Sequence, residues 1–431
     1  MESMNSLLPD DDLAPLPQGG GNRTVAPSAL PALDSTQMLR GLLEDGALLM
    51  PPGTSNQSPL GNDSFEEVRS APSVTPLGDT HLDDILRYSQ QMKASDIHLT
   101  VNLPPMVRVD GKLIPTPWEV VTPREAQRLV YDILLSDQIE RYERTKELDF
   151  SYGVHGVGRF RFNVYRQRGS VGCAMRAIPA KIPSLDSLRM PPILKELTKK
   201  HSGVILVTGP TGSGKSTTIA SMIDVINAER PVHILTMEDP IEYIHSHKVA
   251  MVNQREIGHD SQTFANAIRA ALREDPDVIL VGELRDKETI AAALTLAETG
   301  HLVFGTLHTR SAPATVDRII DVFPSDQQDQ IRVQFAGSLQ AVVAQQLLPM
   351  VGGGRVAAIE IMVATSAVRN LIREGKSHQL LSSIETGGQI GMQQMDKVLA
   401  ELHRSGMVTM EEALSRSNDR DSFLRHLKGG S

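Results

Sequence analysis

The chain contains the run Gly209-Pro210-Thr211-Gly212-Ser213-Gly214-Lys215-Ser216, followed by Thr217. This run matches the phosphate-loop pattern G-x-x-x-x-G-K-[ST] in full. It comes directly after a short run of β-branched residues and before a segment of helical character. Glycines let the backbone wrap around phosphate groups with its N–H groups pointing inward, and the N-terminus of the following helix adds a favourable dipole. The sequence therefore predicts a site for a nucleoside triphosphate.

Two side chains of this loop have expected roles at the phosphates. Lys215 is expected to place its positive charge on the β- and γ-phosphates. Ser216 is expected to ligate Mg²⁺ through its hydroxyl group. A nucleotide and Mg²⁺ are therefore the ligands that this part of the sequence predicts.

Around the loop, short apolar runs alternate with longer helical segments. This alternation predicts an α/β domain with a largely parallel sheet covered by helices. From about Ala364 onward the chain is expected to form short helices. The expected strands are Gly203–Thr208, Val232–Met237, Asp277–Val281 and His301–Thr306.

Polar residues follow three of these strands. Glu238 ends the second strand, Glu283 follows the third and His308 follows the fourth. Because the carboxyl ends of parallel strands meet at one edge of a sheet, we expect these side chains to face the phosphate loop. Glu283 follows an apolar strand, a Walker-B-like pattern that delivers a carboxylate towards Mg²⁺. His308 is expected to sense the γ-phosphate through a neutral imidazole.

Glu238 has two interpretations. An acid at this position can polarise the water that attacks the γ-phosphate. It is equally consistent with a solvated acidic turn before Pro240. The position alone does not decide between them.

Upstream of the phosphate loop, residues 81–180 predict a small α+β domain. Helical spacing over residues 82–92 and 123–135 is interspersed with extended runs, and Asp110-Gly111 favours a tight turn. Arginines concentrate in this domain, and one of them could stabilise charge on the transferred phosphate. Their spacing does not choose among Arg159, Arg161, Arg166, Arg168 and Arg176. Residues 181–195 contain several prolines and are predicted to form a linker. Residues 196–431 are predicted to form the nucleotide-binding domain.

Residues 1–80 differ in composition from the rest. They hold ten of the 26 prolines, eight glycines, 11 acidic and three basic residues. Such a segment cannot bury enough apolar surface to offset the entropy of ordering, so we expect a disordered acidic tail. Its charge of −8 accounts for most of the net −9 of the chain, which leaves the remainder nearly neutral. A nucleic-acid partner is therefore not expected.

Other features of the sequence indicate the cellular compartment of the protein. Cys173 is the sole cysteine, which excludes internal disulfides and cysteine-rich metal sites. No apolar run reaches the about 18 residues that a membrane-spanning helix needs, and the N-terminus lacks the pattern of a secretory signal. A cytoplasmic protein without a transmembrane segment is the expectation.

Taken together, these motifs resemble those of the type II/IV secretion ATPases, most closely the branch of pilus retraction ATPases (the PilT family). The phosphate loop, residues 234–243, the strand before Glu283 and residues 300–309 are similar to that family's Walker A, Asp box, Walker B and His box. Residues 94–99 resemble the family's opening signature. Residues 367–376 resemble its retraction motif, with Val368 in place of isoleucine. The resemblance covers roughly His81 to Leu427.

The resemblance implies a homohexameric ATPase with a small PAS-like N-terminal domain and a RecA-like domain, with ATP and Mg²⁺ bound between them. It makes Glu238 the better candidate for the general base, with Glu283 supporting Mg²⁺ and water. Arg161 and Arg176 fall at the positions of the family's nucleotide-contacting arginines. The implied partners are the inner-membrane pilus platform protein (PilC-like) and a second retraction ATPase, with docking at the inner face of the cytoplasmic membrane.

Two alternatives within the family remain open. An accessory retraction ATPase (PilU-like) shares nearly all of these motifs. A pilus-assembly or type II secretion ATPase shares the same boxes, but usually carries paired Cys-x-x-Cys motifs that a chain with one cysteine lacks. Outside the family, a nucleic-acid motor would need a basic groove with aromatic side chains, which the near-neutral core does not predict.

Overall fold

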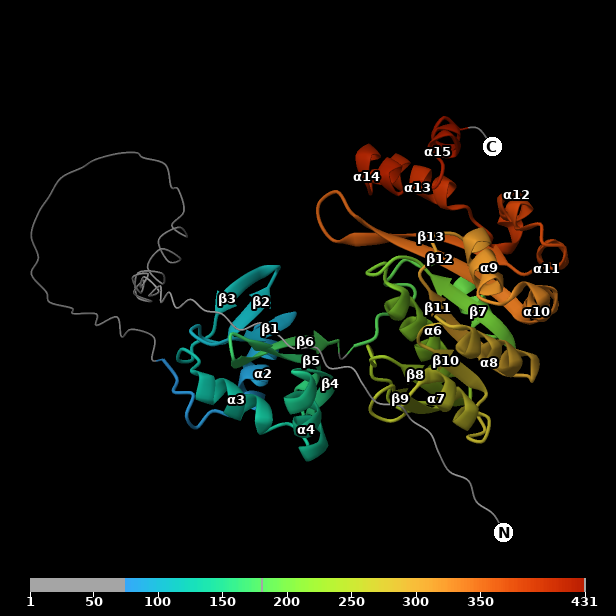
Figure 1. Ribbon diagram of the computed structural model, residues 1–431. Helices are drawn as coiled ribbons and strands as arrows, with labels where there is room; N and C mark the ends of the chain where they lie inside the picture. The colour runs from blue at the N-terminus through green and yellow to red at the C-terminus, as the bar shows by residue number, and fades with distance from the viewer. Residues whose placement is uncertain (1–73, 180, 430–431) are drawn as a thin grey trace, which may run out of the picture. The chain divides into compact units, whose positions relative to one another are not determined.

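The computed structural model describes residues 74–179 and 181–429 (Figure 1). Most of the predicted tail, residues 1–80, lies outside the described residues. Its last part packs on the small domain: Leu77 is fully buried, and the Arg128 guanidinium donates to the carbonyl oxygens of Leu77 and Thr80 at 2.7 and 2.9 Å. Residues 74–80 therefore belong to the small domain. The domain begins earlier than His81, the residue at which the sequence predicts its start.

The small domain is an antiparallel sheet packed against helices. Six strands follow the order β3-β2-β1-β6-β5-β4, and a buried cluster that includes Phe160 and Phe162 fills the space between sheet and helices. Its elements are α2 (Leu82–Gln91), β1 (Asp96–Leu99), β2 (Met106–Val109), β3 (Lys112–Pro115), α3 (Pro123–Tyr131), α4 (Ser136–Thr145), β4 (Glu147–Val154), β5 (Gly158–Gln167) and β6 (Ser170–Ile178).

Local sequence explains several of these elements. α2 begins at a capping box, in which His81 Nδ1 accepts from the Asp83 N–H and the Asp84 carboxylate accepts from the His81 N–H. Asp110 and Gly111 have φ values of 48° and 82°, as a tight turn between β2 and β3 requires. The helix predicted over residues 123–135 ends earlier, at Tyr131. Leu135 is extended and is the N-cap residue of α4, a helix that the sequence did not predict.

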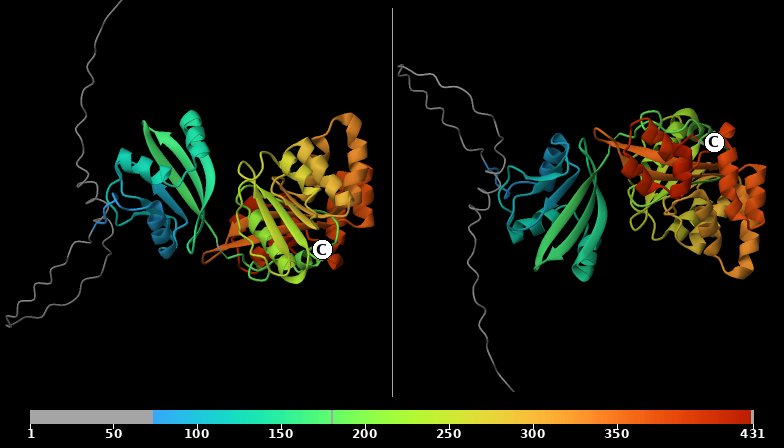
Figure 2. Two further views of the ribbon diagram at one scale, coloured as in Figure 1. Left: turned by 90° about the horizontal axis from the view of Figure 1, so that it is seen from below. Right: turned by 90° about the horizontal axis from the view of Figure 1, so that it is seen from above.

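The larger domain has a seven-stranded sheet in the order β13-β12-β7-β11-β10-β8-β9. All neighbouring strands are parallel except β12 and β13, which form an antiparallel edge pair. Figure 2 shows this sheet from below and from above. Its first elements are α5 (Ile193–Leu197), β7 (Gly203–Thr208), α6 (Lys215–Glu229), β8 (His233–Glu238), β9 (Met251–Glu256), α7 (Phe264–Ala271), β10 (Val278–Val281), α8 (Lys287–Glu298) and β11 (Leu302–Leu307).

Helices cover both faces of the larger sheet. The buried residues of α5 and α6 pack on one face, and those of α7 to α12 pack on the other. This arrangement confirms the predicted α/β class. The remaining elements are α9 (Ala312–Asp321), α10 (Ser325–Ser338), β12 (Leu339–Pro349), β13 (Arg355–Val363), α11 (Ser366–Arg373), α12 (Leu380–Thr386), α13 (Met395–Arg404), α14 (Met410–Arg416) and α15 (Arg420–Leu427), with short 3₁₀ turns at Ser377–Gln379 and Gly388–Ile390.

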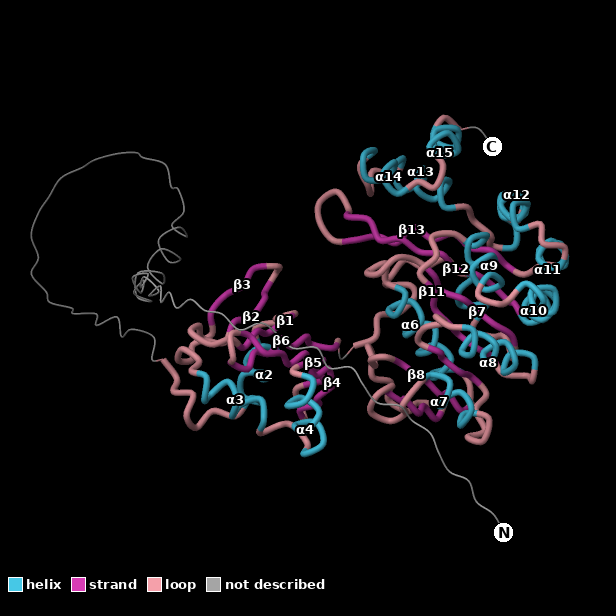
Figure 3. The backbone as a smooth tube through the Cα atoms, viewed as in Figure 1, coloured by secondary structure: helices cyan, strands magenta, loops and turns pink. Residues whose placement is uncertain are grey.

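The four expected strands correspond to β7, β8, β10 and β11, with ends shifted by at most one residue. The sequence did not predict β9, β12 or β13. β12 follows α10 directly, and the β12–β13 hairpin extends beyond the other strands (Figure 3). Among the described residues, no helix is both long enough and apolar enough to cross a lipid bilayer.

Candidate active site

The phosphate loop joins β7 to α6 and contains glycines with positive φ values. Gly209 and Gly214 have φ values of 142° and 89°. A Cβ atom on Gly209 would lie 2.2 Å from the carbonyl oxygen of Gln345, so a side chain cannot fit there. The backbone of the loop therefore packs directly against the backbone of the neighbouring strand β12.

Lys215 lies at the start of α6, with its ammonium group turned back onto the loop. Nζ donates to the carbonyl oxygens of Gly209 at 2.8 Å and Pro210 at 3.2 Å. Burial lowers the pKa of Lys215, and the carboxylates of Glu283 and Glu242 oppose that effect. A half-buried cation held only by neutral carbonyls is a strong binding partner for phosphate oxygens.

The polar residues predicted at the strand ends meet in one cavity. β8, β10 and β11 are parallel neighbours, so Glu238, Glu283 and His308 lie at the same edge of the sheet. The cavity at this edge has a volume of about 490 Å³. It is lined by Thr211, Gly212, Ser213, Gly214, Lys215, Ser216, Thr217, Glu238, Glu283, His308, Arg161 and Arg176, together with Asp239, Pro240, Glu242, Phe264, Gly282, Arg285, Thr306, Leu347 and Arg355.

Glu238 has the most perturbed carboxylate of this cavity. Its Oε1 accepts hydrogen bonds from Thr236 Oγ1 at 2.7 Å and from Gln254 Nε2 at 3.2 Å. Part of the side chain is accessible from the cavity, but protein atoms surround most of the carboxyl group. This burial raises the pKa of Glu238 to about 7, and the two hydrogen bonds only partly offset it. Such a carboxylate can take up a proton near neutral pH.

Glu283 is in the opposite electrostatic situation. His308 Nε2 lies 2.9 Å from Glu283 Oε1, and the Arg285 guanidinium forms an ion pair with the same oxygen. Burial raises the pKa of Glu283, but Arg285 and His308 outweigh it, so the net pKa is lowered. Glu283 is therefore a stable anion beside Lys215 and Ser216. The pKa values of Glu238 and Glu283 are shifted in opposite directions, which is typical of a general base and a carboxylate that stays ionised.

The five candidate arginines of the small domain have different environments. Arg161 on β5 and Arg176 on β6 are paired in register, and both line the cavity. Arg176 Nε also donates to Asp96 Oδ1 at 2.8 Å. The other three are placed elsewhere: Arg159 pairs with Glu256, Arg166 pairs with Glu143, and Arg168 sits in the β5–β6 turn.

A polar contact connects β5 to the segment after Glu238. The buried carboxylate of Glu256 accepts from Arg159 Nη2 at 3.2 Å, from Ser151 Oγ at 2.9 Å and from the Ile241 N–H at 3.3 Å. Arg161 is two residues from Arg159 on the same strand. The contact therefore helps to hold β5, which carries Arg161, against the end of β8, which carries Glu238.

The residues present fit a Mg²⁺ ion. The Ser216 hydroxyl and the Glu283 carboxylate line the same cavity, and oxygen atoms of this kind are the ligands that Mg²⁺ prefers. Within residues 74–179 and 181–429, no group of three or more His, Cys, Asp or Glu side chains is arranged to hold a metal unaided. Mg²⁺ bound together with nucleotide phosphates needs only one or two protein ligands.

Three residues of the site were missed by the sequence analysis. Gln345 on β12 donates from Nε2 to the Ser213 carbonyl oxygen at 2.7 Å and accepts from Thr218 Oγ1 at 2.8 Å. Arg355 on β13 lines the cavity, and Arg285 pairs with Glu283. Arg285 was close in sequence to a predicted residue. Gln345 and Arg355 belong to strands that were not predicted.

The chain is similar to known proteins of one family. A model of the type II/IV secretion system protein family matches residues 173–353. The chain is 48% identical over 342 residues to the type IV pilus retraction ATPase PilT of Pseudomonas aeruginosa, covering 79% of this chain and 99% of that protein. It is 37% identical over 350 residues to the type IV pilus ATPase PilU of the same organism, covering 81% and 92%. The crystal structure of the pilus retraction motor PilT with bound ADP superimposes with a TM-score of 0.77 at 49% identity, covering 80% of this chain and all of that chain.

Proposed function

This chain belongs to the type II/IV secretion ATPase family, and we propose that it is the ATP-hydrolysing motor that retracts a type IV pilus. The observation that carries the proposal is the similarity to PilT, which extends over 99% of that retraction ATPase at 48% identity. The described cavity supplies the groups that ATP hydrolysis needs. They are a phosphate loop, an acid with a pKa near 7, an ionised acid and two arginines.

The proposed chemistry assigns one task to each group. The phosphate loop and Lys215 bind the β- and γ-phosphates of ATP. Glu238 takes the proton of the attacking water, because its raised pKa lets it act as a base near neutral pH. Ser216 and Glu283 would hold Mg²⁺, which neutralises phosphate charge when it is bound. His308 orients Glu283 and senses the γ-phosphate through that contact.

Arg161 and Arg176 complete the proposed site from the small domain. Their guanidinium groups would stabilise the negative charge that develops on the transferred phosphate. Because they lie on a different domain from the phosphate loop, ATP binding would draw the small domain towards the phosphates and hydrolysis would release it. We propose that this closure is the power stroke of the motor.

The assembly and location follow from the same proposal. We infer a homohexameric ring, in which successive closures turn into displacement of an inner-membrane pilus platform protein (PilC-like). The ring would act at the cytoplasmic face of the membrane, where ATP is available. A second retraction ATPase could share this platform.

An accessory role is the second candidate, because the chain is also 37% identical to PilU over 92% of that ATPase. The identity to PilT is higher, which favours the principal retraction motor. An assembly role is less well supported, because the single cysteine, Cys173, cannot form the paired Cys-x-x-Cys motifs of those ATPases.

The experiment is a count of surface pili on cells whose only copy carries Lys215→Ala. Loss of phosphate binding should give excess pili and abolish twitching, because filaments are built but no longer withdrawn. Lys200→Ala removes an exposed lysine just before β7 and should leave the pilus count at the wild-type level. Cells without pili would show that the motor assembles filaments, and an unchanged count would favour the accessory role.

A further inference from the structure

A second cavity lies among the C-terminal helices, outside the residues used for ATP. Its volume is about 800 Å³, which is within the range of ligand-binding pockets. α12, α13 and α15 contribute most of its lining. Two buried apolar side chains, Ile384 and Met392, are 1% and 5% exposed and contribute apolar surface to the lining. None of the family motifs falls on this lining.

Positive charge is in excess around this cavity. Four cations line it, against the two acids Glu385 and Glu401; they are Lys397, Arg404, Arg425 and Lys428. In the described part of the chain, none of these six side chains forms an ion pair with another residue. Cations that gather without acidic partners repel one another, and a bound anion would relieve that repulsion.

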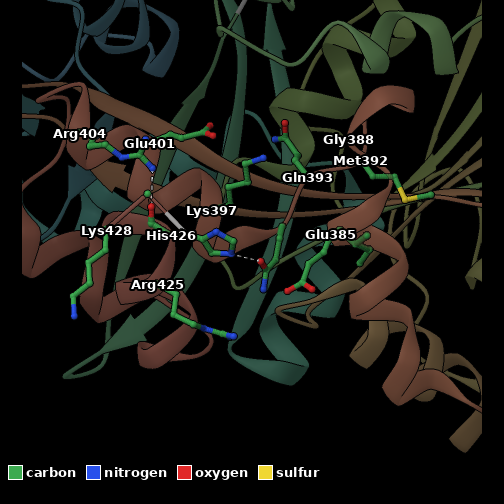
Figure 4. A pocket seen from close by; sticks show the side chains of 13 residues that line it. Glu385, Gly388, Met392, Gln393, Lys397, Glu401, Arg404, Arg425, His426 and Lys428 are labelled. Carbon is green, nitrogen blue, oxygen red and sulfur yellow. Dashed lines mark hydrogen bonds between the residues drawn. The ribbon is translucent and has the colours of Figure 1, made fainter. Parts of the chain in front are cut away.

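The wall of the cavity is held in place by hydrogen bonds. Arg404 Nη2 donates to the His426 carbonyl oxygen at 2.9 Å. His426 Nε2 lies 2.8 Å from Gln394 Oε1, and Gln394 Nε2 donates to Ser422 Oγ at 3.3 Å. Figure 4 shows Arg404, His426 and Arg425 following one another along one side, with Met392 and Glu385 on the other. A wall that is already ordered loses less entropy when it binds a partner.

The lining does not suit a nucleotide or a free polyphosphate. α12 and α15 present their carboxyl-terminal turns to the cavity, and these ends carry partial negative charge. Glu385 and Glu401 stand among the four cations, so a compact polyphosphate would meet these carboxylates as well, whereas a peptide can place its acidic and apolar side chains separately. The lining also contains no Phe, Tyr or Trp ring on which a nucleobase could stack.

A short peptide matches the lining better. Lys397, Glu401 and Arg404 lie at i, i+4 and i+7 on α13, so they form one face that runs for about 10 Å. That length accommodates about three residues of extended chain. Acidic side chains of such a peptide would meet the cations, and an apolar side chain would contact Ile384 and Met392. Recognition of acidic motifs by clustered arginines is a recurring mode of peptide binding.

We propose that this cavity is the docking site for a short acidic segment, with an apolar anchor residue, on a partner protein of the motor. The cavity lining is hydrogen-bonded to the sheet of the ATPase domain. Gln393, on the lining, donates from Nε2 to the Ile359 carbonyl oxygen of β13 at 2.6 Å, and its backbone exchanges hydrogen bonds with Ile361. A docked partner would therefore contact a segment that is bonded to the edge of the nucleotide-binding domain.

The test uses the full chain saturated with ADP and a fluorescein-labelled peptide, acetyl-Leu-Asp-Glu-Leu-Asp-Glu-Leu-amide. Fluorescence anisotropy should show saturable binding that weakens as salt is raised. The double variant Lys397→Glu with Arg425→Glu should weaken binding at least tenfold. The neutral pair Lys397→Met with Arg425→Met should weaken it in the same direction. A peptide with lysine in place of every acid should not bind.

The matched control reverses the same number of charges outside the cavity. Arg420→Glu with Lys200→Glu should bind the acidic peptide as the wild type does, and all variants should keep wild-type ATP turnover and melting temperature. Equal binding by the cavity and control variants, or no saturable binding, would overturn the proposal. Displacement of the peptide by micromolar pyrophosphate would identify a small-anion site instead. Tighter binding after deletion of residues 1–73 would identify the chain's own acidic segment as the occupant and would also overturn it.

Discussion

The side-chain amide of Gln345 donates a 2.7 Å hydrogen bond to the carbonyl oxygen of Ser213, in the middle of the phosphate loop. The same side chain accepts from Thr218 Oγ1 in the first turn of α6. Both bonds are buried. A single residue of β12 therefore connects the loop that wraps the phosphates to the helix whose N-terminus faces them.

Replacing Gln345 by leucine should weaken nucleotide binding. The variant keeps the volume of the side chain but leaves the Ser213 carbonyl and the Thr218 hydroxyl without a partner, at a cost of about 1–2 kcal/mol. We expect the dissociation constant for ADP, measured by calorimetry, to rise about 5–30-fold. Gln346→Leu is the matched control, because Gln346 bonds to the Arg416 carbonyl instead. Equal effects of the two variants would contradict a specific role of Gln345.

Gln345 also shows which part of the site could not be predicted from the sequence. The phosphate loop and three strand ends could be predicted because each lies in a short run with a characteristic pattern. β12 has no such pattern: it follows α10 without a turn, and its glutamines interrupt the apolar run. Its residues reach the loop across more than 120 positions of the chain, a contact that only the folded sheet creates.

The arginines give a second example of this limit. Alternation along β5 correctly separates Phe160 and Phe162, which are buried, from Arg159 and Arg161 on the opposite face. Spacing could not tell which arginine serves the cavity. The choice depends on Glu256, nearly 100 residues away, which is buried and binds Arg159. Resemblance to a family pointed to Arg161 and Arg176, and both line the cavity.

Replacing Glu238 by glutamine should separate binding from turnover. Glutamine can still bond to Thr236 and Gln254 with its amide, but it cannot take a proton from water. We expect ATP binding to persist and the steady-state hydrolysis rate to fall by about 10²–10⁴-fold. A variant with near-normal turnover would transfer the role of base to Glu283, for which the matched change is Glu283→Gln.

The raised pKa of Glu238 also predicts how stability depends on pH. The pKa is about 7 in the folded chain and 4.5 ordinarily, so between these values the folded state keeps a proton that the unfolded state releases. Stability therefore falls as pH rises through this window, and the full cost is present above pH 7. Glu238→Gln should remove it, stabilising the nucleotide-free protein by about 1–3 kcal/mol at pH 8 and little at pH 4.5.

Urea unfolding at the two pH values measures this difference. The control is Glu411→Gln, which neutralises an exposed acid in the first turn of α14. It should not show a gain that grows with pH. An equal change in Glu238→Gln at both pH values would mean that burial of the carboxylate is not costly.

Arg161 should act on turnover more than on binding. Its guanidinium is expected to stabilise charge that develops only during phosphoryl transfer. Arg161→Ala should therefore lower kcat for ATP by about 10²-fold or more, with a smaller change in the dissociation constant for ADP. Arg168→Asn is the control, because asparagine tolerates the positive φ of that turn residue and Arg168 does not line the cavity. A loss of ADP affinity with unchanged kcat would show that Arg161 only holds the nucleotide.

Deleting the N-terminal segment should have an effect that depends sharply on where the deletion ends. Removal of residues 1–73 leaves every described contact in place, so ATP turnover, ring formation and melting temperature should match the wild type. Removal of residues 1–80 also takes away Leu77, which is fully buried, and the two carbonyl groups that accept from Arg128. Loss of a buried leucine costs about 2–5 kcal/mol, so the longer deletion should lower the melting temperature of the small domain.

Differential scanning calorimetry of the two deletions makes the comparison. Equal melting temperatures would place the start of the small domain at His81 after all, and loss of turnover in the shorter deletion would give the acidic segment a direct part in the motor.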